Sequence, residues 1–406
     1  MFLLIVSAGK DSVNQANIQI NFILFGIFLT YSYLFASREG TLARKNKDLE
    51  PLLQPEGMEC GVAMIRGGYN ARIKKEKKTL VLCSLIRTFA AMTNDEFYMQ
   101  RCIQLAANGI QGARPNPMVG AVIVAPLTSH LSLLTSKIIG EGYHVRCGEG
   151  HAEVNAFASV RPEDEALLKD ATIYVSLEPC SHYGKTPPCA DLIIKKGVRR
   201  VVVGTIDPFA EVQGRGIRKL QEAGIDVTVG VLEKECQWLN RRFFTYHREH
   251  RPYIILKWAQ TANGFIDDHG KALQISNEQT QMLSHQLRAE EDAILVGHTT
   301  DVREHPQLTV RHWHGPNPKR IVLTHNRPLP QLMDDLYQHV IQSLIVEGGR
   351  QTLESFITAG LWDEIRVETG AMTVADGTRA PQLPANVSLL SRETYDDNTL
   401  YRYISL

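Results

Sequence analysis

The chain has 406 residues, 44% of them hydrophobic, which is too long for one compact core and predicts at least two domains. Lys+Arg and Asp+Glu are equal at 44 each, so the chain lacks the basic excess that is typical of nucleic-acid-binding proteins. Its seven cysteines show no small-scaffold spacing, which favours reduced thiols in a cytoplasmic setting over a disulfide framework.

Residues 1–91 differ from the rest of the chain and show no domain-like periodicity. Within them, residues 18–36 are rich in Ile, Leu and Phe and long enough to cross a bilayer. The basic residues that follow would leave the remaining chain on the cytoplasmic side. We expect an N-terminal extension that is either an over-extended gene start or a genuine membrane anchor. Thr93 and Glu96 form a capping box directly after Met92, which favours the first alternative.

Residues 92–240 alternate between helical and strand-like patterns, which predicts an α/β domain of three layers. The predicted elements, in order, are a helix at 96–108, a hairpin at 119–124 and 138–143, a helix from 151, a strand at 171–177, a helix ending at 197, a strand at 200–204, a helix at 217–223 and a strand at 226–231. Such sheets place their sites in loops at the carboxyl ends of strands.

Residues 240–252 are charged and aromatic without a clear period, and we interpret them as the connection between two domains. The alternation of strand and helix patterns over residues 252–406 then predicts a second α/β domain. Its expected strands lie at 253–258, 293–297, 320–324, 343–347 and 400–404, and its expected helices lie at 278–290 and 352–359.

Four residues of the first domain have the pattern of a catalytic zinc site. His151, Cys180 and Cys189 supply three ligands, which leaves the fourth position of a tetrahedral zinc ion open for water. Glu153 follows His151 in the His-x-Glu arrangement of zinc deaminases, where the carboxylate moves protons and does not bind the metal. The pattern therefore predicts hydrolytic deamination.

Three alternatives stay open at this point. A structural zinc site would need a fourth ligand, for which His182 and Cys147 are the nearest candidates. A nucleic-acid deaminase would need a basic patch with stacking aromatic residues, and the balanced charge argues against it. The third alternative is a non-catalytic zinc protein anchored to a membrane.

Several motifs of the first domain resemble the bifunctional riboflavin-biosynthesis family, which joins a diaminohydroxyphosphoribosylaminopyrimidine deaminase to a 5-amino-6-(5-phosphoribosylamino)uracil reductase. The motifs are Asn116-Pro-Met-Val-Gly-Ala, Gly140-Glu-Gly-Tyr-His, His151-Ala-Glu-Val-Asn-Ala and Leu177-Glu-Pro-Cys-Ser-His-Tyr-Gly-Lys-Thr-Pro-Pro-Cys. The eight residues between Cys180 and Cys189 separate this family from deaminases that use Cys-x-x-Cys. The resemblance implies a cytidine-deaminase-like sandwich, a base pocket lined by Asn116, and catalysis by Glu153 beside the zinc ion.

The second half is similar to the NADPH-dependent reductase of that family, which implies a dihydrofolate-reductase-like fold. Substrate-binding positions then fall on Arg288, Leu308, Arg311 and Glu347. NADPH-binding positions fall on Ala259, Thr300, Glu304 and Gly349. The partners implied are small-molecule substrates, with no nucleic acid, and a homo-oligomer stays open.

Three departures from the family pattern affect the reductase half. Asn263 and Glu304 stand where the family often has Asp. Residues 325–342 are too few to supply two further strand units that the family has before the strand at 343–347, so we expect a domain that is truncated internally. The alternative function is therefore deamination alone, with a C-terminal domain that does not catalyse reduction.

Overall fold

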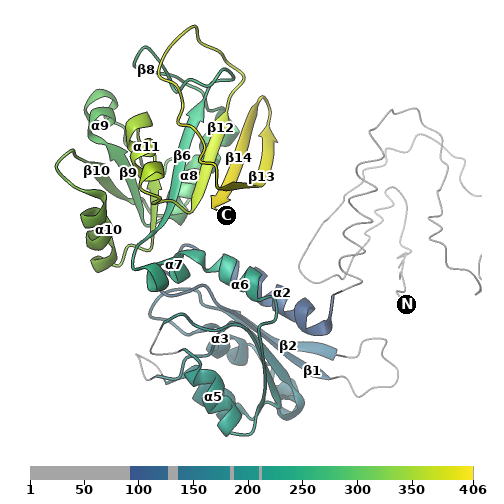
Figure 1. Ribbon diagram of the computed structural model, residues 1–406. Helices are drawn as coiled ribbons and strands as arrows, with labels where there is room; N and C mark the ends of the chain where they lie inside the picture. Colours follow the sequence, from purple (N-terminus) through teal and green to yellow (C-terminus); the bar gives the residue numbers. More distant parts are fainter. Residues whose placement is uncertain (1–91, 127–135, 183–186, 210–212, 406) are drawn as a thin grey trace, which may run out of the picture. The chain divides into compact units, whose positions relative to one another are not determined.

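The computed structural model describes residues 92–126, 136–182, 187–209 and 213–405, and those from Asn94 onward form one compact unit (Figure 1). The predicted N-terminal extension, with its candidate membrane span, and the tip of the first hairpin lie outside the described residues. In the part that is described, no helix combines the length and the apolar character needed to cross a bilayer.

The first half is built on a five-stranded sheet with the order β2-β1-β3-β4-β5. Its first three strands pair antiparallel, whereas β3, β4 and β5 run parallel. The strands are β1 (Gly120–Pro126), β2 (Ser136–Tyr143), β3 (Thr172–Leu177), β4 (Arg200–Thr205) and β5 (Asp226–Val229). Each strand predicted for this half is confirmed. Strands β1, β3 and β4 are buried along almost their whole length, which matches their continuous apolar runs.

Helices cover both faces of this sheet, which confirms the predicted three layers. Helix α2 lies on one face together with α6, and α3, α4 and α5 lie on the other (Figure 1). The helices are α2 (Asn94–Ala107), α3 (Ala152–Ala158), the 3₁₀ segment η2 (Pro162–Asp170), α4 (Cys189–Lys196), α5 (Arg215–Glu222) and α6 (Glu233–Leu239). Ile123 and Ile173 of the sheet pack against Ala156 of α3 and Ile193 of α4, so the core lies directly below the strand ends that carry the motifs.

The connection between the halves is more regular than its sequence suggests. Residues 240–252, interpreted as the connection between two domains, contain a helix, α7 (Arg241–Glu249), that was not predicted. The sequence hides the period because α7 is buried on several sides: Phe243 and Phe244 pack on Leu177 of β3, and Arg242 forms a buried ion pair with Glu291.

The second half contains a seven-stranded sheet with the order β10-β9-β11-β6-β12-β14-β13. The first five strands of that order are parallel, and the last two are antiparallel. They are β6 (Tyr253–Gln260), β9 (Ala293–Gly297), β10 (Lys319–Leu323), β11 (Ser343–Val346), β12 (Glu364–Thr369), β13 (Val387–Tyr395) and β14 (Asn398–Ser405). A short hairpin, β7 (Asp267–Asp268) with β8 (Lys271–Ala272), follows β6.

Two helix layers flank this second sheet. Leu336 of α10 (Leu329–Gln338) and Phe356 of α11 (Arg350–Thr358) pack on one face, and Leu287 of α8 (Glu278–Glu290) packs on the other. A further helix, α9 (His298–Glu304), follows β9. The sequence analysis identified α8 and α11 but missed α9, α10, β12 and β13.

The segment between β10 and β11 holds only α10, and β10 is consequently an edge strand of the sheet (Figure 1). The residue count predicted this absence of further strands in the described segment. Whether the domain is truncated relative to its family stays a prediction.

Candidate functional site

The three predicted zinc ligands converge at the carboxyl end of β3. His151 is the N-cap residue of α3, Cys180 lies in the loop after β3, and Cys189 is the first residue of α4. The ligand atoms of these residues all lie within 4.8 Å of one another. The His151 Nδ1 atom is 3.6 Å from the Cys180 sulfur and 3.4 Å from the Cys189 sulfur.

This donor set fits a zinc ion. Zinc–nitrogen and zinc–sulfur bonds of about 2.0 and 2.3 Å at a tetrahedral angle place the ligand atoms roughly 3.6 Å apart, close to the distances found here. Interaction with Cys189 and His151 lowers the pKa of Cys180 to about 4, whereas Cys180 and burial raise the pKa of Cys189. The two sulfur atoms would both be thiolates only with a cation between them, which a bound metal ion would supply.

Glu153 lies in the first turn of α3 and is only 3% exposed. Burial, together with the neighbouring Cys180 sulfur, raises the pKa of Glu153 to about 7. A carboxyl group with a pKa near the working pH is suited to accept a proton and to release it again.

Asn116 is held by a histidine to which the sequence analysis assigned no role. The Asn116 Nδ2 atom is 3.1 Å from His144 Nε2, and His144 Nδ1 is 3.2 Å from the Gly150 carbonyl oxygen. Because a carbonyl oxygen accepts, Nδ1 carries the proton and Nε2 accepts from Asn116. The His144 ring also packs edge-on against His151, with ring centroids 5.3 Å apart. The signal was present in the Gly140-Glu-Gly-Tyr-His motif, where the histidine directly follows strand β2.

The loop that carries Cys180 is fixed by the residue two positions before it. The buried Glu178 carboxylate accepts hydrogen bonds from the backbone amides of Gly214 and Gly216, both at 2.9 Å. A Cβ atom at position 216 would lie 2.0 Å from the Pro179 carbonyl oxygen, so only glycine allows this approach. The start of α5 therefore sets the position of the metal-binding loop.

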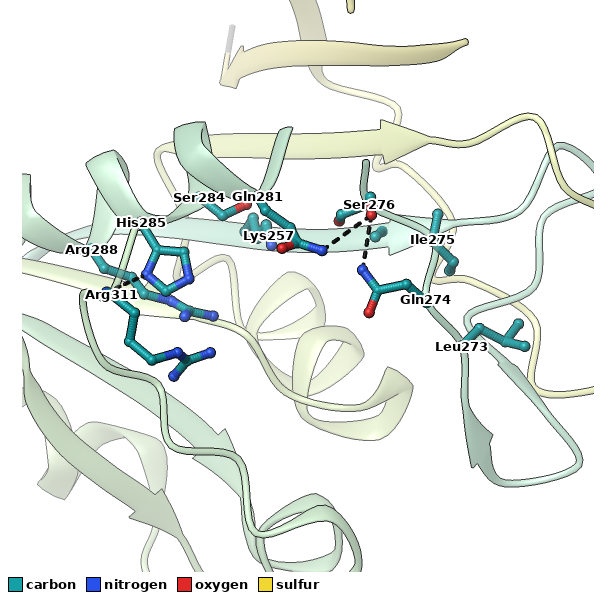
Figure 2. A pocket seen from close by; sticks show the side chains of 11 residues that line it. Lys257, Leu273, Gln274, Ile275, Ser276, Gln281, Ser284, His285, Arg288 and Arg311 are labelled. Carbon is teal, nitrogen blue, oxygen red and sulfur yellow. Dashed lines mark hydrogen bonds between the residues drawn. The ribbon is translucent and has the colours of Figure 1, made fainter. Parts of the chain in front are cut away.

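The second half holds a cavity of about 270 Å³ beside β6 and α8. Its lining includes three of the predicted residues, Ala259, Arg288 and Arg311, together with Lys257 and His285. Figure 2 shows the side chains of Arg288 and Arg311 side by side at one end of this cavity, next to His285. A polar, cationic cavity of this kind suits an anionic ligand.

The two predicted arginines differ in their surroundings. Arg288 Nη2 donates to Glu347 Oε2 at 2.7 Å, so its charge is largely neutralised by a carboxylate whose side chain is only 10% exposed. Arg311 donates instead to neutral oxygens of Gln307 and Thr309, both at 3.0 Å. Among the residues that the structure describes, Arg311 has no carboxylate partner, so its positive charge is available to a ligand.

Glu347 lies between two cations at the end of β11. Burial raises its pKa, but Lys257 and Arg288 lower it further, so the net shift is downward and the carboxylate is charged. Within the described residues, Glu347 Oε1 and Arg288 Nε are buried without a hydrogen-bond partner. Orphaned polar atoms beside a cavity fit a site that a polar ligand completes.

His285 is a second residue that the sequence analysis missed. Its Nδ1 atom accepts a hydrogen bond from the Arg311 backbone amide at 2.9 Å, which ties α8 to the loop that carries Arg311. Burial, with the nearby charges of Arg288 and Arg311, lowers the pKa of His285 to about 4, so the ring is neutral at pH 7.

The remaining predicted residues are spread along the same end of the sheet. Leu308 is buried in the core and has a positive φ of 54°, so its side chain shapes the loop and does not line the cavity. Gly349 caps the N-terminus of α11, and a Cβ atom there would lie 3.0 Å from the Thr300 hydroxyl oxygen. Glu304 pairs with its neighbour Arg303 at 2.6 Å. Backbone amides at the start of α11, after two glycines, fit the diphosphate of a dinucleotide.

Comparison with known proteins agrees with both halves of this description. Residues 92–205 match the model of the cytidine and deoxycytidylate deaminase zinc-binding region, and residues 252–400 match the RibD C-terminal domain. The riboflavin biosynthesis protein RibD of Aquifex aeolicus is 37% identical, over 70% of this chain and 88% of its own length. The chain belongs to the RibD family.

Other members of the RibD family show the same similarity over most of their length. The RibD protein of Bacillus amyloliquefaciens is 33% identical over 71% of this chain and 87% of its own length. The crystal structure of a diaminohydroxyphosphoribosylaminopyrimidine deaminase/5-amino-6-(5-phosphoribosylamino)uracil reductase from Thermotoga maritima is 32% identical, with a TM-score of 0.69. It covers 77% of this chain and 99% of its own. RibD proteins thus share the two-part fold described here.

Proposed function

We propose that this RibD-family protein catalyses two successive steps of riboflavin biosynthesis. The first is zinc-dependent hydrolytic deamination of 2,5-diamino-6-(5-phosphoribosylamino)pyrimidin-4-one. The second is NADPH-dependent reduction of the ribose of 5-amino-6-(5-phosphoribosylamino)uracil. The observation that supports the proposal most strongly is the cluster of His151, Cys180 and Cys189 beside a buried Glu153.

In the deamination, His151, Cys180 and Cys189 would hold the zinc ion. Zinc, when bound, supplies a Lewis acid that makes water available as a nucleophile at neutral pH. Glu153 accepts the proton that the attacking water loses and donates it to the departing amino group, so ammonia leaves as the oxygen–carbon bond replaces the nitrogen–carbon bond. Asn116, oriented by His144, binds the edge of the pyrimidinone ring.

In the reduction, Ala259, Thr300, Glu304 and Gly349 are the candidate contacts for the cofactor, and NADPH, when bound, supplies the hydride. Arg311 is our candidate ligand for the substrate phosphate, because its charge is uncompensated. Arg288 has a different role: its ion pair with Glu347 holds that carboxylate at the edge of the cavity. Leu308 contributes by shaping the loop before Arg311.

The match of residues 252–400 to the RibD C-terminal domain supports reduction as a second activity over the alternative of deamination alone. We infer small-molecule substrates as partners. We propose a cytoplasmic location, since thiolate ligands such as Cys180 and Cys189 favour a reducing compartment.

The proposed function is tested with purified protein and the diaminopyrimidinone substrate. We expect ammonia release that depends on zinc, and NADPH oxidation that depends on the deaminated product. Ammonia release without subsequent NADPH oxidation would favour the deaminase-only alternative. Absence of both, in protein that carries stoichiometric zinc, would contradict the proposal.

A further inference from the structure

The base-pocket loop, residues 112–118, is the segment of the deaminase half that carries Asn116. Asn116 itself makes one side-chain contact to His144 within its own half. The loop packs on α2 and α6 of its own half through Ala113 and Met118, and its polar contacts on either side of Asn116 reach residues outside the first sheet and its helices. These external contacts raise the question of what positions the base-reading amide.

Arg114 provides the largest set of such contacts. Its guanidinium donates to the carbonyl oxygens of Glu290 at 2.8 Å and Ala289 at 3.1 Å, and to the Asp292 carboxylate at 3.0 Å. The two carbonyls belong to the last turn of α8, where backbone oxygens lack partners within the helix and a cation is favourable. The side chains of Arg114 and Asp292 are only 16% and 18% exposed, so solvent screens this pair less than a surface pair.

Gln342 links the next residue of the loop, Pro115, to the same carboxylate. Gln342, which precedes β11, donates from its side chain to the Pro115 carbonyl oxygen at 2.7 Å. The same residue donates its backbone amide to Asp292 Oδ2 at 2.8 Å. Asp292 thus receives Arg114 on one oxygen and Gln342 on the other, and it joins the base-pocket loop to the reductase sheet.

The linker holds the end of the base-pocket loop. Asn240, between α6 and α7, accepts from the Met118 amide at 2.8 Å and donates to the Met118 carbonyl at 2.7 Å. Asn116 therefore stands between two anchor points, neither of which belongs to the deaminase sheet.

We infer that Arg114 is a positioning residue for deamination, through which the reductase half holds the base-pocket loop in its binding conformation. The inference rests on the proposed function, because it assigns Asn116 to the substrate base. Loss of the three Arg114 contacts frees the loop on one side of Asn116, so the amide samples orientations that do not bind. The zinc cluster is unaffected because none of its ligands contacts the loop directly.

The variants Arg114→Met and Asp292→Asn in the full chain test this inference from opposite sides. The first removes all three hydrogen bonds while keeping a similar side-chain volume. The second weakens the acceptor from within the reductase half, where a change in deamination is otherwise unexpected. Arg114→Lys keeps the charge but not the fork of donors and should restore part of the effect.

Two control variants separate loop positioning from general loss of contacts. Tyr246→Phe removes the hydrogen bond from Tyr246 to the Tyr337 carbonyl oxygen, which joins the connecting helix α7 to α10 of the reductase half and is distant in sequence from the base-pocket loop. Arg200→Met removes a comparable two-pronged pair with Asp95 at the start of β4, opposite the strand ends that carry the site.

In Arg114→Met we expect KM for the deaminase substrate to rise about tenfold, within the roughly 10²-fold that a misplacement of about 1 Å can cause. Zinc content, reductase kinetics and deaminase kcat should change little. Hydrogen–deuterium exchange of amides 112–118 should speed up in both test variants and in neither control. The exchange measurement does not depend on activity.

If the wild-type protein is active and the two variants Arg114→Met and Asp292→Asn have its KM and its amide exchange rates, this inference is overturned and the proposed function is not. An equal rise of KM in Tyr246→Phe would also overturn it, since docking in general would then suffice. Wild-type protein that carries zinc and releases no ammonia would overturn the proposed function, and the assignment to Asn116 with it.

Discussion

The two candidate sites of this protein are assembled in different ways. The candidate zinc site gathers its three predicted ligands and the predicted proton carrier from two short motifs at neighbouring strand and helix ends, and the distances between the ligand atoms fit a zinc ion. The candidate reductase cavity collects residues from β6, α8 and two loops, and one of its charged residues, Arg288, is paired with Glu347 after β11. A site built from short motifs keeps its chemistry visible in the sequence, whereas a site built from scattered residues depends on which side chains pair in the fold.

Removal of a zinc ligand should have the largest effect on the deaminase half. We expect Cys180→Ser and Cys189→Ser each to lose zinc and deamination together, because three ligands leave no redundancy. Metal analysis by mass spectrometry and ammonia release are the measurements. Cys147→Ser, which changes an exposed cysteine outside the cluster, is the matched control and should keep both. Full zinc occupancy in the two ligand variants would show that the ligands are assigned wrongly.

Removal of the proton carrier should separate chemistry from metal binding. Glu153→Gln keeps the side-chain size and should retain zinc, but kcat for deamination should fall by roughly 10²–10⁴, the usual contribution of a general acid–base group. Steady-state kinetics with parallel zinc analysis measure this. Near-normal turnover in this variant would exclude the proposed mechanism.

The two halves should also differ in the rates of their reactions. We expect the reductase to be slower than the deaminase, because β10 is an edge strand and only α10 lies between it and β11 in the described segment. Hydride transfer requires the reacting atoms to be held about 3–3.5 Å apart, which needs a rigid floor under the cofactor. Steady-state NADPH oxidation with deaminated substrate measures it. A kcat in the common range of roughly 1–10³ per second would contradict the expectation.

The smallest predicted effects are those of replacing the two arginines of the reductase cavity, and they should differ from each other. Arg311→Met should raise KM for the deaminated substrate by roughly tenfold, since loss of one charge-assisted hydrogen bond costs about 1.5–3 kcal/mol. Arg288→Met leaves Glu347 without its nearest cation and should lower thermal stability as well. Arg327→Met, which removes a pair with Asp335 at α10, is the control for loss of an arginine elsewhere in this domain. Equal effects of the first two variants on KM and stability would refute the distinction.

Local patterns were enough to predict most elements and the whole metal cluster. Helix α8 runs from Glu278 to Glu290 as its period predicts, and α4 ends before Gly197, which adopts the left-handed conformation that glycine tolerates. Elements whose burial is set by distant partners were missed. Helix α7 has no visible stripe because it contacts both halves, and the short α9 has no buried residue to mark a face.

The sequence by itself determined which chemical groups the first site contains: an imidazole, a carboxylate and two thiols, in this order and spacing, predict a zinc ion with a proton carrier, because ligand type and spacing are local properties. The tertiary structure decided which polar residues became partners. It brought His144 to Asn116, Glu347 to Arg288 and Asp292 to Arg114 across gaps of 28, 59 and 178 positions. No local pattern encodes such pairs, since they form only when separate strands and helices pack against each other and exclude water from the groups they bring together.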